Sequence, residues 1–389
     1  MPEKRLTAEQ WAISMAGSSS GGVKGGDYLR IPLAFTRRLL RTLARSRDRK
    51  GISQQHGVVS DSGGVMTVPQ ARLLALAVGA LFSVSCGLEP DAPLVSKSPI
   101  QSLAAQRFAN SEWSAPVNLG APVNTAAGEM NAALSPDELS LYFTSNREGG
   151  LGATDIWVSH RDCADCAWQA PVNLGAPVNS ASADAGPRLS IDGHLLFFQS
   201  DRPGGEGFAD IYLSRRHNTN DDLGWGDPIH LGTDVNSSTA EQAADYLQSA
   251  EDGVGNLYFN RGIANATDIY YVAVRRNGET RGPAVLVAEL SDPTALDQHA
   301  TVRKDGREVF LASLRGGGLG GFDLWTSTRD NVHAPWTAPV NVGAPLNTTA
   351  NDMQPSLTGD GRTLLFTSDR PGGLGGNDLW VSMRTTSGH

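Results

Sequence analysis

The chain of 389 residues has little of what a helical or disulfide-built protein needs. It holds only three cysteines and 7% aromatic residues, and no long amphipathic helical pattern follows residue 86. The few cysteines exclude a small scaffold held together by disulfides. Glycine (44 residues) and proline (21 residues) are abundant instead. This balance favours a turn-rich, all-β protein.

Sequence motifs for catalysis are also missing. The chain contains no HExxH, no GxSxG and no Walker sequence, and its histidines are scattered. No helix with Lys-Ser/Thr follows the Gly-rich stretches, so these are not phosphate-binding loops. From these absences we expect a protein that is not an enzyme, has no cofactor and acts by binding.

The charge is unevenly distributed. The net charge is −9, yet residues 1–65 are basic, so the body from Cys86 onward is more acidic than the total indicates. An acidic body repels a phosphate backbone, which argues against nucleic-acid binding. Metal cations, cationic ligands and basic protein surfaces fit it better.

Residues 66–85 have the parts of a secretory signal peptide. Arg72 precedes an apolar run over Leu73–Val84, which is too short to span a bilayer, and small residues precede Cys86. The segment resembles a bacterial lipoprotein signal, although Ser83 stands where that family usually has Leu. The resemblance implies a lipid on Cys86 and a lipid-anchored protein of the cell envelope, on the periplasmic side or the surface, with the outer membrane favoured. Plain secretion and a buried apolar helix are the alternatives.

The segments around this signal carry no strand pattern. A signal peptide must lie near the N-terminus, so we expect residues 1–65 to be non-native or disordered, and residues 86–112 to be a flexible linker. A basic membrane-surface helix over Ala34–Arg47 is the rival interpretation for the first segment.

Internal repetition is the strongest signal in the chain. A unit of about 55 residues occurs five times over residues 113–384. Each unit opens with a sequence such as WSAPVNLGAPVN and closes with a sequence such as SDRPGGLGGNDLWVSMR. The fourth unit lacks the Trp that opens the others. We expect five four-stranded blades of a β-propeller.

Each unit divides into four expected strands. The first strand of a unit corresponds to Asn131–Leu134, the second to Leu141–Thr144, the third to Ile156–Val158 and the outer strand to Ala115–Leu119. Asp-Gly pairs such as Asp192-Gly193 predict tight turns between the first two strands. The first unit has Asp137-Glu138 there, which predicts a different turn.

The two ends of the repeat region predict how the ring closes. It begins on an outer-strand segment at Trp113 and ends on a third strand at Arg384, so the first segment can complete the last blade. The repeated motif SDRPGG-x-G-x-x-D-[IL]-[WY] resembles the WD-type propeller repeat of the TolB family. The chain has five such units, whereas TolB-type propellers usually have six blades. The resemblance implies an envelope interaction module that binds a protein, peptidoglycan or glycan.

Five arginines stand seven or eight residues before five aspartates across the Gly-rich loops. We expect each pair to hold its own loop, as a structural device repeated by the architecture. The pairs run from Arg147 with Asp155, through Arg202 with Asp210, Arg261 with Asp268 and Arg315 with Asp323, to Arg370 with Asp378.

Five further acids stand just before the first strands. Because first strands line the axis of a propeller, these acids are candidates for a negative mouth that binds Ca²⁺ or another cation or ligand. The alternative is that each acid caps its own loop. The five are Glu129, Asp184, Glu241, Asp297 and Asp352.

Cys163 and Cys166 form the sequence CADC between two units. No further Cys or His clusters nearby, so a zinc site is not indicated. A small loop disulfide in an oxidising compartment and two free thiols are the remaining readings.

The leading function at this point is a non-catalytic binding or scaffold lipoprotein of the envelope. The alternative is a glycoside hydrolase or lyase, because arabinanase-type hydrolases are five-bladed propellers that use axial carboxylates. Such chemistry needs two non-equivalent acids. The five acids recur in near-equivalent settings, and only Asp297-Gln298-His299 is a local variant.

Overall fold

The computed structural model describes residues 113–248, 254–263 and 266–384. Cys86 and the segments 1–65, 66–85 and 86–112 therefore lie outside the described residues. All twenty described elements are β-strands, and no helix is assigned in the described ranges. No described helix is long and apolar enough to cross a membrane.

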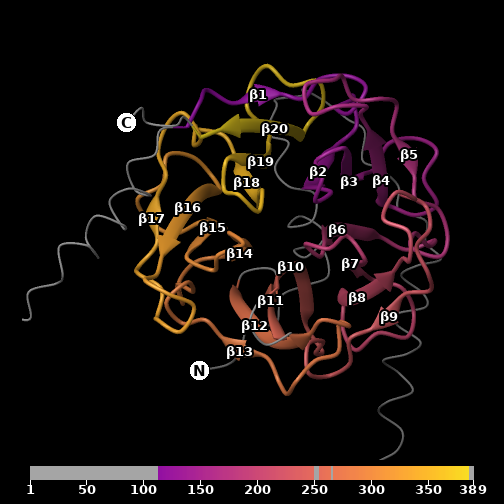
Figure 1. Ribbon diagram of the computed structural model, residues 1–389. Helices are drawn as coiled ribbons and strands as arrows, with labels where there is room; N and C mark the ends of the chain where they lie inside the picture. The colour runs from indigo at the N-terminus through magenta and orange to yellow at the C-terminus, as the bar shows by residue number, and fades with distance from the viewer. Residues whose placement is uncertain (1–112, 249–253, 264–265, 385–389) are drawn as a thin grey trace, which may run out of the picture. The chain divides into compact units, whose positions relative to one another are not determined.

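The twenty strands form five antiparallel sheets of four strands each, arranged as five blades around an axis (Figure 1). The predicted five-bladed propeller is confirmed. The innermost strands are β2 (Glu129–Leu134), β6 (Asp184–Leu189), β10 (Ala240–Gln248), β14 (Asp297–Val302) and β18 (Asp352–Leu357). The second strands are β3 (Ser140–Ser145), β7 (Leu195–Ser200), β11 (Val254–Ile263), β15 (Glu308–Ser313) and β19 (Thr363–Ser368).

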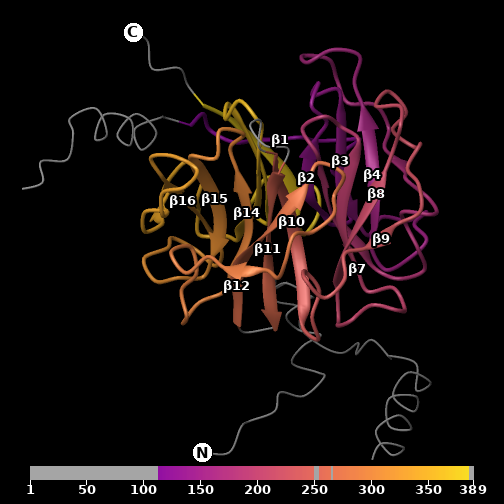
Figure 2. The same ribbon diagram turned by 60° about the horizontal axis from the view of Figure 1, so that its bottom comes forward.

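The outer half of each blade follows the same order. The third strands are β4 (Asp155–His160), β8 (Asp210–Arg215), β12 (Ala266–Arg275), β16 (Asp323–Thr328) and β20 (Asp378–Met383). The outermost strands are β1 (Val117–Asn118), β5 (Val172–Asn173), β9 (Ile229–His230), β13 (Val285–Leu286) and β17 (Val340–Asn341). Seen from another direction, the strands run from one face of the ring to the other (Figure 2).

The ring closes through its two ends. Strand β1, the first in the chain, pairs antiparallel with β20, the last, through Val117 opposite Val381 and Asn118 opposite Trp380. The fifth blade is therefore composite, as the order of the repeats predicts, and this pairing protects the edge that β20 would otherwise expose.

Apolar packing lies between neighbouring blades. Five clusters of buried side chains each join two adjacent blades; for example, Phe197 of β7 packs with Tyr246 of β10. The second strands supply the most deeply buried side chains, such as Phe143 and Phe310. Because each cluster needs both neighbours, the blades are stable as a ring rather than one by one.

Positions in each innermost strand are counted from its acid, Glu129 in β2 and the equivalent acid in the others, as position 1. A β-bulge interrupts every innermost strand at position 3. The residue there has positive φ in all five blades, and only one of the five is glycine. The five are Asn131, Gly186, Ala243, His299 and Gln354. In four blades its backbone N–H donates to a side chain on the preceding blade, as Gly186 does to Thr144 at 3.0 Å. The bulge thus ties each inner strand to its neighbour.

The turns after the innermost strands correct one expectation. Only the second residue of each Asp-Gly pair has positive φ, as at Gly193 (72°), so the hairpin is longer than a two-residue turn. Glu138 takes the same conformation with φ 59°, so the first unit has the same turn as the others. Within this turn the Glu138 N–H donates to the Ser135 carbonyl at 2.8 Å, in a conformation that a residue with a side chain disfavours. The Asp252-Gly253 turn lies outside the described residues.

Candidate functional site

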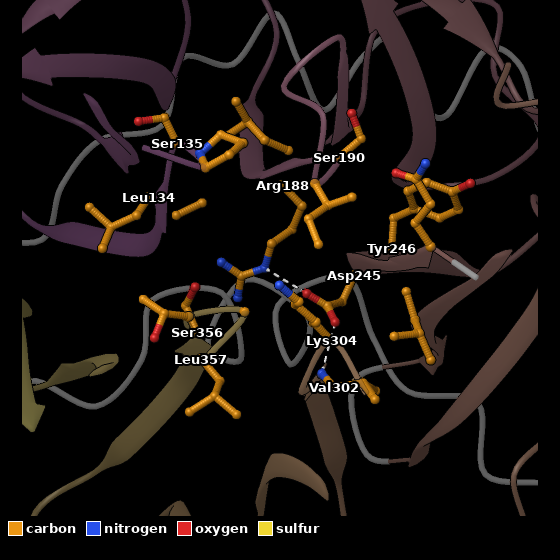
Figure 3. Close-up of a pocket in the computed structure, with 18 of the residues that line it drawn as sticks. Leu134, Ser135, Arg188, Ser190, Asp245, Tyr246, Val302, Lys304, Ser356 and Leu357 are labelled. Carbon is orange, nitrogen blue, oxygen red and sulfur yellow. Dashed lines mark hydrogen bonds and ion pairs between the residues drawn. The ribbon is translucent and has the colours of Figure 1, made fainter. Parts of the chain in front are cut away.

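A polar cavity of about 440 Å³ lies on the axis, at the face where the innermost strands end (Figure 3). Its volume is within the range of small-molecule sites. All five blades contribute to its lining, and each contributes one charged residue. These are Glu138, Arg188, Asp245, Lys304 and Asp360.

Two of these charges occupy equivalent places in the repeat. Arg188 of β6 and Asp245 of β10 both stand at position 5 of their strands. The other blades carry Ala133, Thr301 and Ser356 at this position. The axis is thus specialised in the second and third blades. A charge at a position that is otherwise small or neutral is the sequence signal that would have indicated this site.

Arg188 reaches across the axis. Its guanidinium donates to the Ala132 carbonyl on β2 and to the Pro355 carbonyl on β18, the latter at 2.8 Å. Its Nε lies 3.6 Å from Asp245 Oδ1 (Figure 3). Because Arg188 contacts three other blades, it both holds the ring together and fills the inner end of the cavity.

Asp245 is a carboxyl group in a poorly solvated place. Its side chain is 15% exposed, and burial raises its pKa, against the opposing effect of the Arg188 cation. Its Oδ2 accepts the Val302 N–H at 2.9 Å, and its Oδ1 accepts the Thr301 hydroxyl at 3.4 Å. A carboxyl with a raised pKa is suited to donate a proton.

Asp360 lies on the rim of the same cavity in a different environment. Its side chain is 52% exposed, and its Oδ1 accepts the Arg362 N–H at 2.9 Å and the Thr358 hydroxyl at 2.7 Å. Partial burial opposes these hydrogen bonds, but they lower the pKa of Asp360 overall. The cavity therefore combines one carboxyl whose pKa is raised with a second whose pKa is lowered.

The five acids predicted to form a cation mouth lie at the opposite ends of the innermost strands. All five are 0% exposed, and each pairs with an arginine of its own blade. Arg202, for example, lies 2.7 Å from Asp184, which also accepts the Ser180 N–H. The structure thus has each acid capping its own loop, the alternative to an open mouth. The five are Glu129, Asp184, Glu241, Asp297 and Asp352.

These pairs correct the expected partners of the repeated arginines. Arg147 binds Glu129, eighteen residues earlier, at 3.0 Å and does not pair with Asp155. Asp155 instead accepts backbone N–H groups of its Gly-rich loop, including Gly152 at 3.2 Å, and Asn173 at 3.1 Å. The spacing along the chain suggested the wrong acid because the innermost strand, distant in sequence, lies beside the loop.

The Asp297-Gln298-His299 variant provides a buried histidine. His299 is 7% exposed, and burial, with a smaller contribution from the Arg188 cation, lowers its pKa to about 3. His299 is therefore neutral at ordinary pH, and Asp297 is held by Arg315. Neither is available as an exposed acid or base.

Cys163 and Cys166 are joined by a disulfide in the structure, in the exposed loop that follows β4. The Cys166 N–H also donates to the Cys163 carbonyl at 2.9 Å. The bond closes a four-residue loop between the first two repeats.

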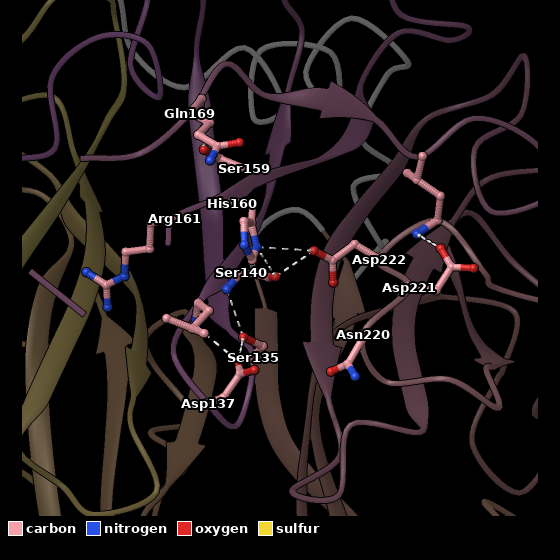
Figure 4. A network of polar contacts seen from close by, with 12 residues as sticks. Ser135, Asp137, Ser140, Ser159, His160, Arg161, Gln169, Asn220, Asp221 and Asp222 are labelled. Carbon is pink, nitrogen blue, oxygen red and sulfur yellow. Dashed lines mark hydrogen bonds and ion pairs between the residues drawn. The ribbon is translucent and has the colours of Figure 1, made fainter. Parts of the chain in front are cut away.

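A second polar cluster lies between the first two blades (Figure 4). Asp222 accepts the hydroxyls of Ser140 at 2.5 Å and Tyr142 at 2.8 Å, and Arg216 at 3.1 Å. His160 Nδ1 lies 3.4 Å from the Ser140 hydroxyl. Because Ser140 donates directly to Asp222, His160 is not placed as a base between them, so this is not a hydrolytic triad. The cluster fixes the loop around Asp222 onto the first blade.

No group of His, Cys, Asp and Glu in the described part of the chain is arranged to hold a metal ion.

Comparison with known proteins found similar solved structures but no family. No family model and no curated protein matches the chain. Among solved structures, a thermostable family-43 glycoside hydrolase shares 13% identity over 69% of this chain and 94% of its own, with a TM-score of 0.48. The α-L-arabinofuranosidase PaAbf62A from Podospora anserina shares 12% identity over 72% of this chain and 98% of its own, with a TM-score of 0.47. A structure titled "putative TolB from Agrobacterium tumefaciens" shares 16% identity over 63% of this chain and 71% of its own, with a TM-score of 0.40.

These similarities show the fold alone, yet they correct the expectation of a non-catalytic scaffold. Glycoside hydrolases and TolB proteins both appear among structures with this fold. A five-bladed ring without a catalytic sequence motif therefore gives no reason to exclude an enzyme, and the inference from missing motifs to missing activity was wrong.

Proposed function

We propose that this protein is a glycoside hydrolase whose site is the axial cavity. The observation that carries the proposal is that Asp245 and Asp360 line one cavity while their environments shift their pKa values in opposite directions. Glycoside hydrolysis uses such a pair, one carboxyl protonated and one ionised.

The two carboxyl groups have distinct roles in this proposal. Asp245 donates its proton to the glycosidic oxygen as the bond to the anomeric carbon breaks. Asp360, ionised on the rim, supports the addition of water at that carbon, and the proton lost by water balances the one donated. The charge of Arg188 beside Asp245 stabilises the carboxylate that forms after the proton leaves.

The lining agrees with a polyhydroxylated ligand. Hydroxyl side chains from three blades line the same cavity as the two acids: Ser135, Ser190 and Ser356 (Figure 3). Lys304 adds a cation on the fourth blade. Mixed donors and acceptors of this kind bind sugar hydroxyls better than they bind an apolar ligand.

The test is hydrolysis of a polysaccharide panel that includes arabinan, arabinoxylan, xylan and peptidoglycan. We expect activity on at least one, abolished by Asp245→Asn and reduced by at least about a hundredfold by Asp360→Asn. Asp192→Asn is the matched control, since Asp192 holds the equivalent turn of the second blade but does not line the cavity. Thermal melting of each variant separates loss of activity from loss of folding. A panel without any hydrolysis, or an Asp192→Asn variant as inactive as Asp360→Asn, contradicts the proposal.

We further propose that the protein acts in the cell envelope, anchored by a lipid on Cys86. Residues 66–85, which resemble a lipoprotein signal, and the TolB-like motif of the repeats support this location. An envelope or extracellular glycan is then the substrate. Membrane fractionation tests the anchor: the wild type should sediment with membranes, and Cys86→Ser should be released into the soluble fraction. Equal release of both contradicts the anchor.

A further inference from the structure

The inner end of the axial cavity is closed by one side chain. Arg188 extends from the second blade to carbonyl groups on the first and fifth blades, at Ala132 and Pro355, and pairs with Asp245 on the third. The Arg188 side chain is only 9% exposed. Its guanidinium is therefore the floor of the cavity, and a ligand cannot pass along the axis.

One side of the cavity is higher than the rest. When the blades are aligned on their acids, β10 continues two residues beyond the point where the other innermost strands end. The second strand of this blade, β11, begins two residues earlier than the other second strands. Two residues of strand correspond to about 7 Å. Tyr246, Leu247 and Gln248 of this extension line the cavity. The third blade thus forms a wall that the first and fifth blades lack.

A floor and a one-sided wall restrict how a long polymer can approach. A chain lying straight across the axis meets the β10–β11 wall on one side, whereas a chain end can enter from the lower side at the first and fifth blades. Asp245 lies next to the floor, bonded to Val302, and Asp360 lies on the lower rim. A terminal sugar unit inserted from the rim lies between Asp360 and Asp245, so both acids can reach the bond that joins it to the rest of the chain.

We propose that the enzyme is exo-acting: it takes the end of a glycan chain into this cavity and releases the terminal unit. This inference rests on the proposed hydrolase function and adds the mode of attack. The glycosidic bond between the inserted unit and the rest of the chain breaks, the outgoing oxygen receives a proton, and water supplies the hydroxyl and the proton that balance the step.

The experiment measures products and binding on whichever panel polysaccharide is cleaved. Products are separated by size during the first few per cent of the reaction, and the viscosity of the polymer solution is followed at the same time. We expect one small sugar product and a viscosity that stays nearly constant. An early mixture of oligosaccharides with falling viscosity overturns the exo mode and leaves the hydrolase function standing.

Binding gives a second readout that does not need turnover. Asp360→Asn, a substitution on the exposed rim, is titrated with each intact panel polysaccharide and with the same polymer shortened tenfold by partial acid hydrolysis. We expect about ten times as many binding sites per unit mass in the shortened sample. Equal capacity in both overturns the exo mode alone. No binding and no cleavage of any polymer overturns the hydrolase function, and the exo mode with it.

Discussion

The guanidinium of Arg384 lies 4.6 Å from the centre of the Trp113 ring, and the same two residues form a backbone bridge. These residues begin and end the described ring, so the contact joins its ends. The same contact lies within single blades elsewhere, as between Arg161 and Trp168 at 4.4 Å. One repeated device therefore serves as an ordinary blade contact and as the closure of the ring.

Trp113→Ala should weaken the closure more than its counterpart weakens a blade. We expect a loss of about 3 kcal/mol in the free energy of unfolding, because a large side chain and a cation–π contact are removed together. Urea unfolding measures the loss, and hydrogen exchange should show faster exchange along β20. Trp168→Ala is the control: it should lose stability without exposing β20. Equal exchange at β20 in both variants contradicts a special role for closure.

Asp184→Asn should destabilise the ring rather than remove a cation site. Asp184 is fully buried and bonded to Arg202, so the substitution leaves an arginine without its charge partner. We expect a loss of about 3 kcal/mol or more in the free energy of unfolding. Melting with and without millimolar Ca²⁺ should give the same midpoint for the wild type. A rise in midpoint with Ca²⁺ that Asp184→Asn abolishes would contradict this role.

Arg188→Met should be among the most damaging single changes at the axis. It leaves the poorly solvated Asp245 without its cation and the Pro355 carbonyl without its donor. We expect a loss of about 3–5 kcal/mol in the free energy of unfolding. The double variant Arg188→Met with Asp245→Leu should be more stable than Arg188→Met alone, because no poorly solvated carboxyl group is then left without its partner. A double variant whose loss is the sum of the two single losses contradicts the pairing.

His299 predicts how stability responds to acid. Its pKa is about 3 in the folded state against 6.5 when solvated, so the unfolded chain binds more protons between these values. Stability from this residue is complete above pH 6.5 and is lost as the pH falls toward 3. The slope for one proton is at most about 1.4 kcal/mol per pH unit. Urea unfolding from pH 7 to 4 should show a smaller loss for His299→Asn, since Asn also occupies this bulge position at Asn131. Parallel losses in both proteins contradict the prediction.

Glu138→Gly should stabilise the protein. Glu138 has φ 59° at a turn position that three other blades fill with glycine, and a side chain costs about 1 kcal/mol in that conformation. We expect a gain of about 1 kcal/mol in the free energy of unfolding. Gly193→Ala, the reverse change in the second blade, should lose a similar amount. A loss of stability in Glu138→Gly would show that the side chain of Glu138 outweighs the strain.

The ring could be predicted from the sequence because its signals are local and repeated. Short apolar stretches such as Leu141–Thr144, turn residues such as Gly193 and the position of Trp113 each act within one unit or at its end. Five copies of the same pattern leave few architectures that bury every sheet. The outer strand was overestimated, since only Val117–Asn118 of Ala115–Leu119 pairs as a strand.

The amino-acid sequence by itself determined the number of blades, their strand order and the closure of the ring, because each depends on a pattern confined to about 55 residues. Only the tertiary structure decided which charges meet. Arg147 reaches Glu129 rather than Asp155, and Arg188 meets Asp245 from another blade. Side chains far apart in sequence converge on an axis that no single unit contains, so the cavity and its two unlike carboxyl groups exist only once the ring has closed.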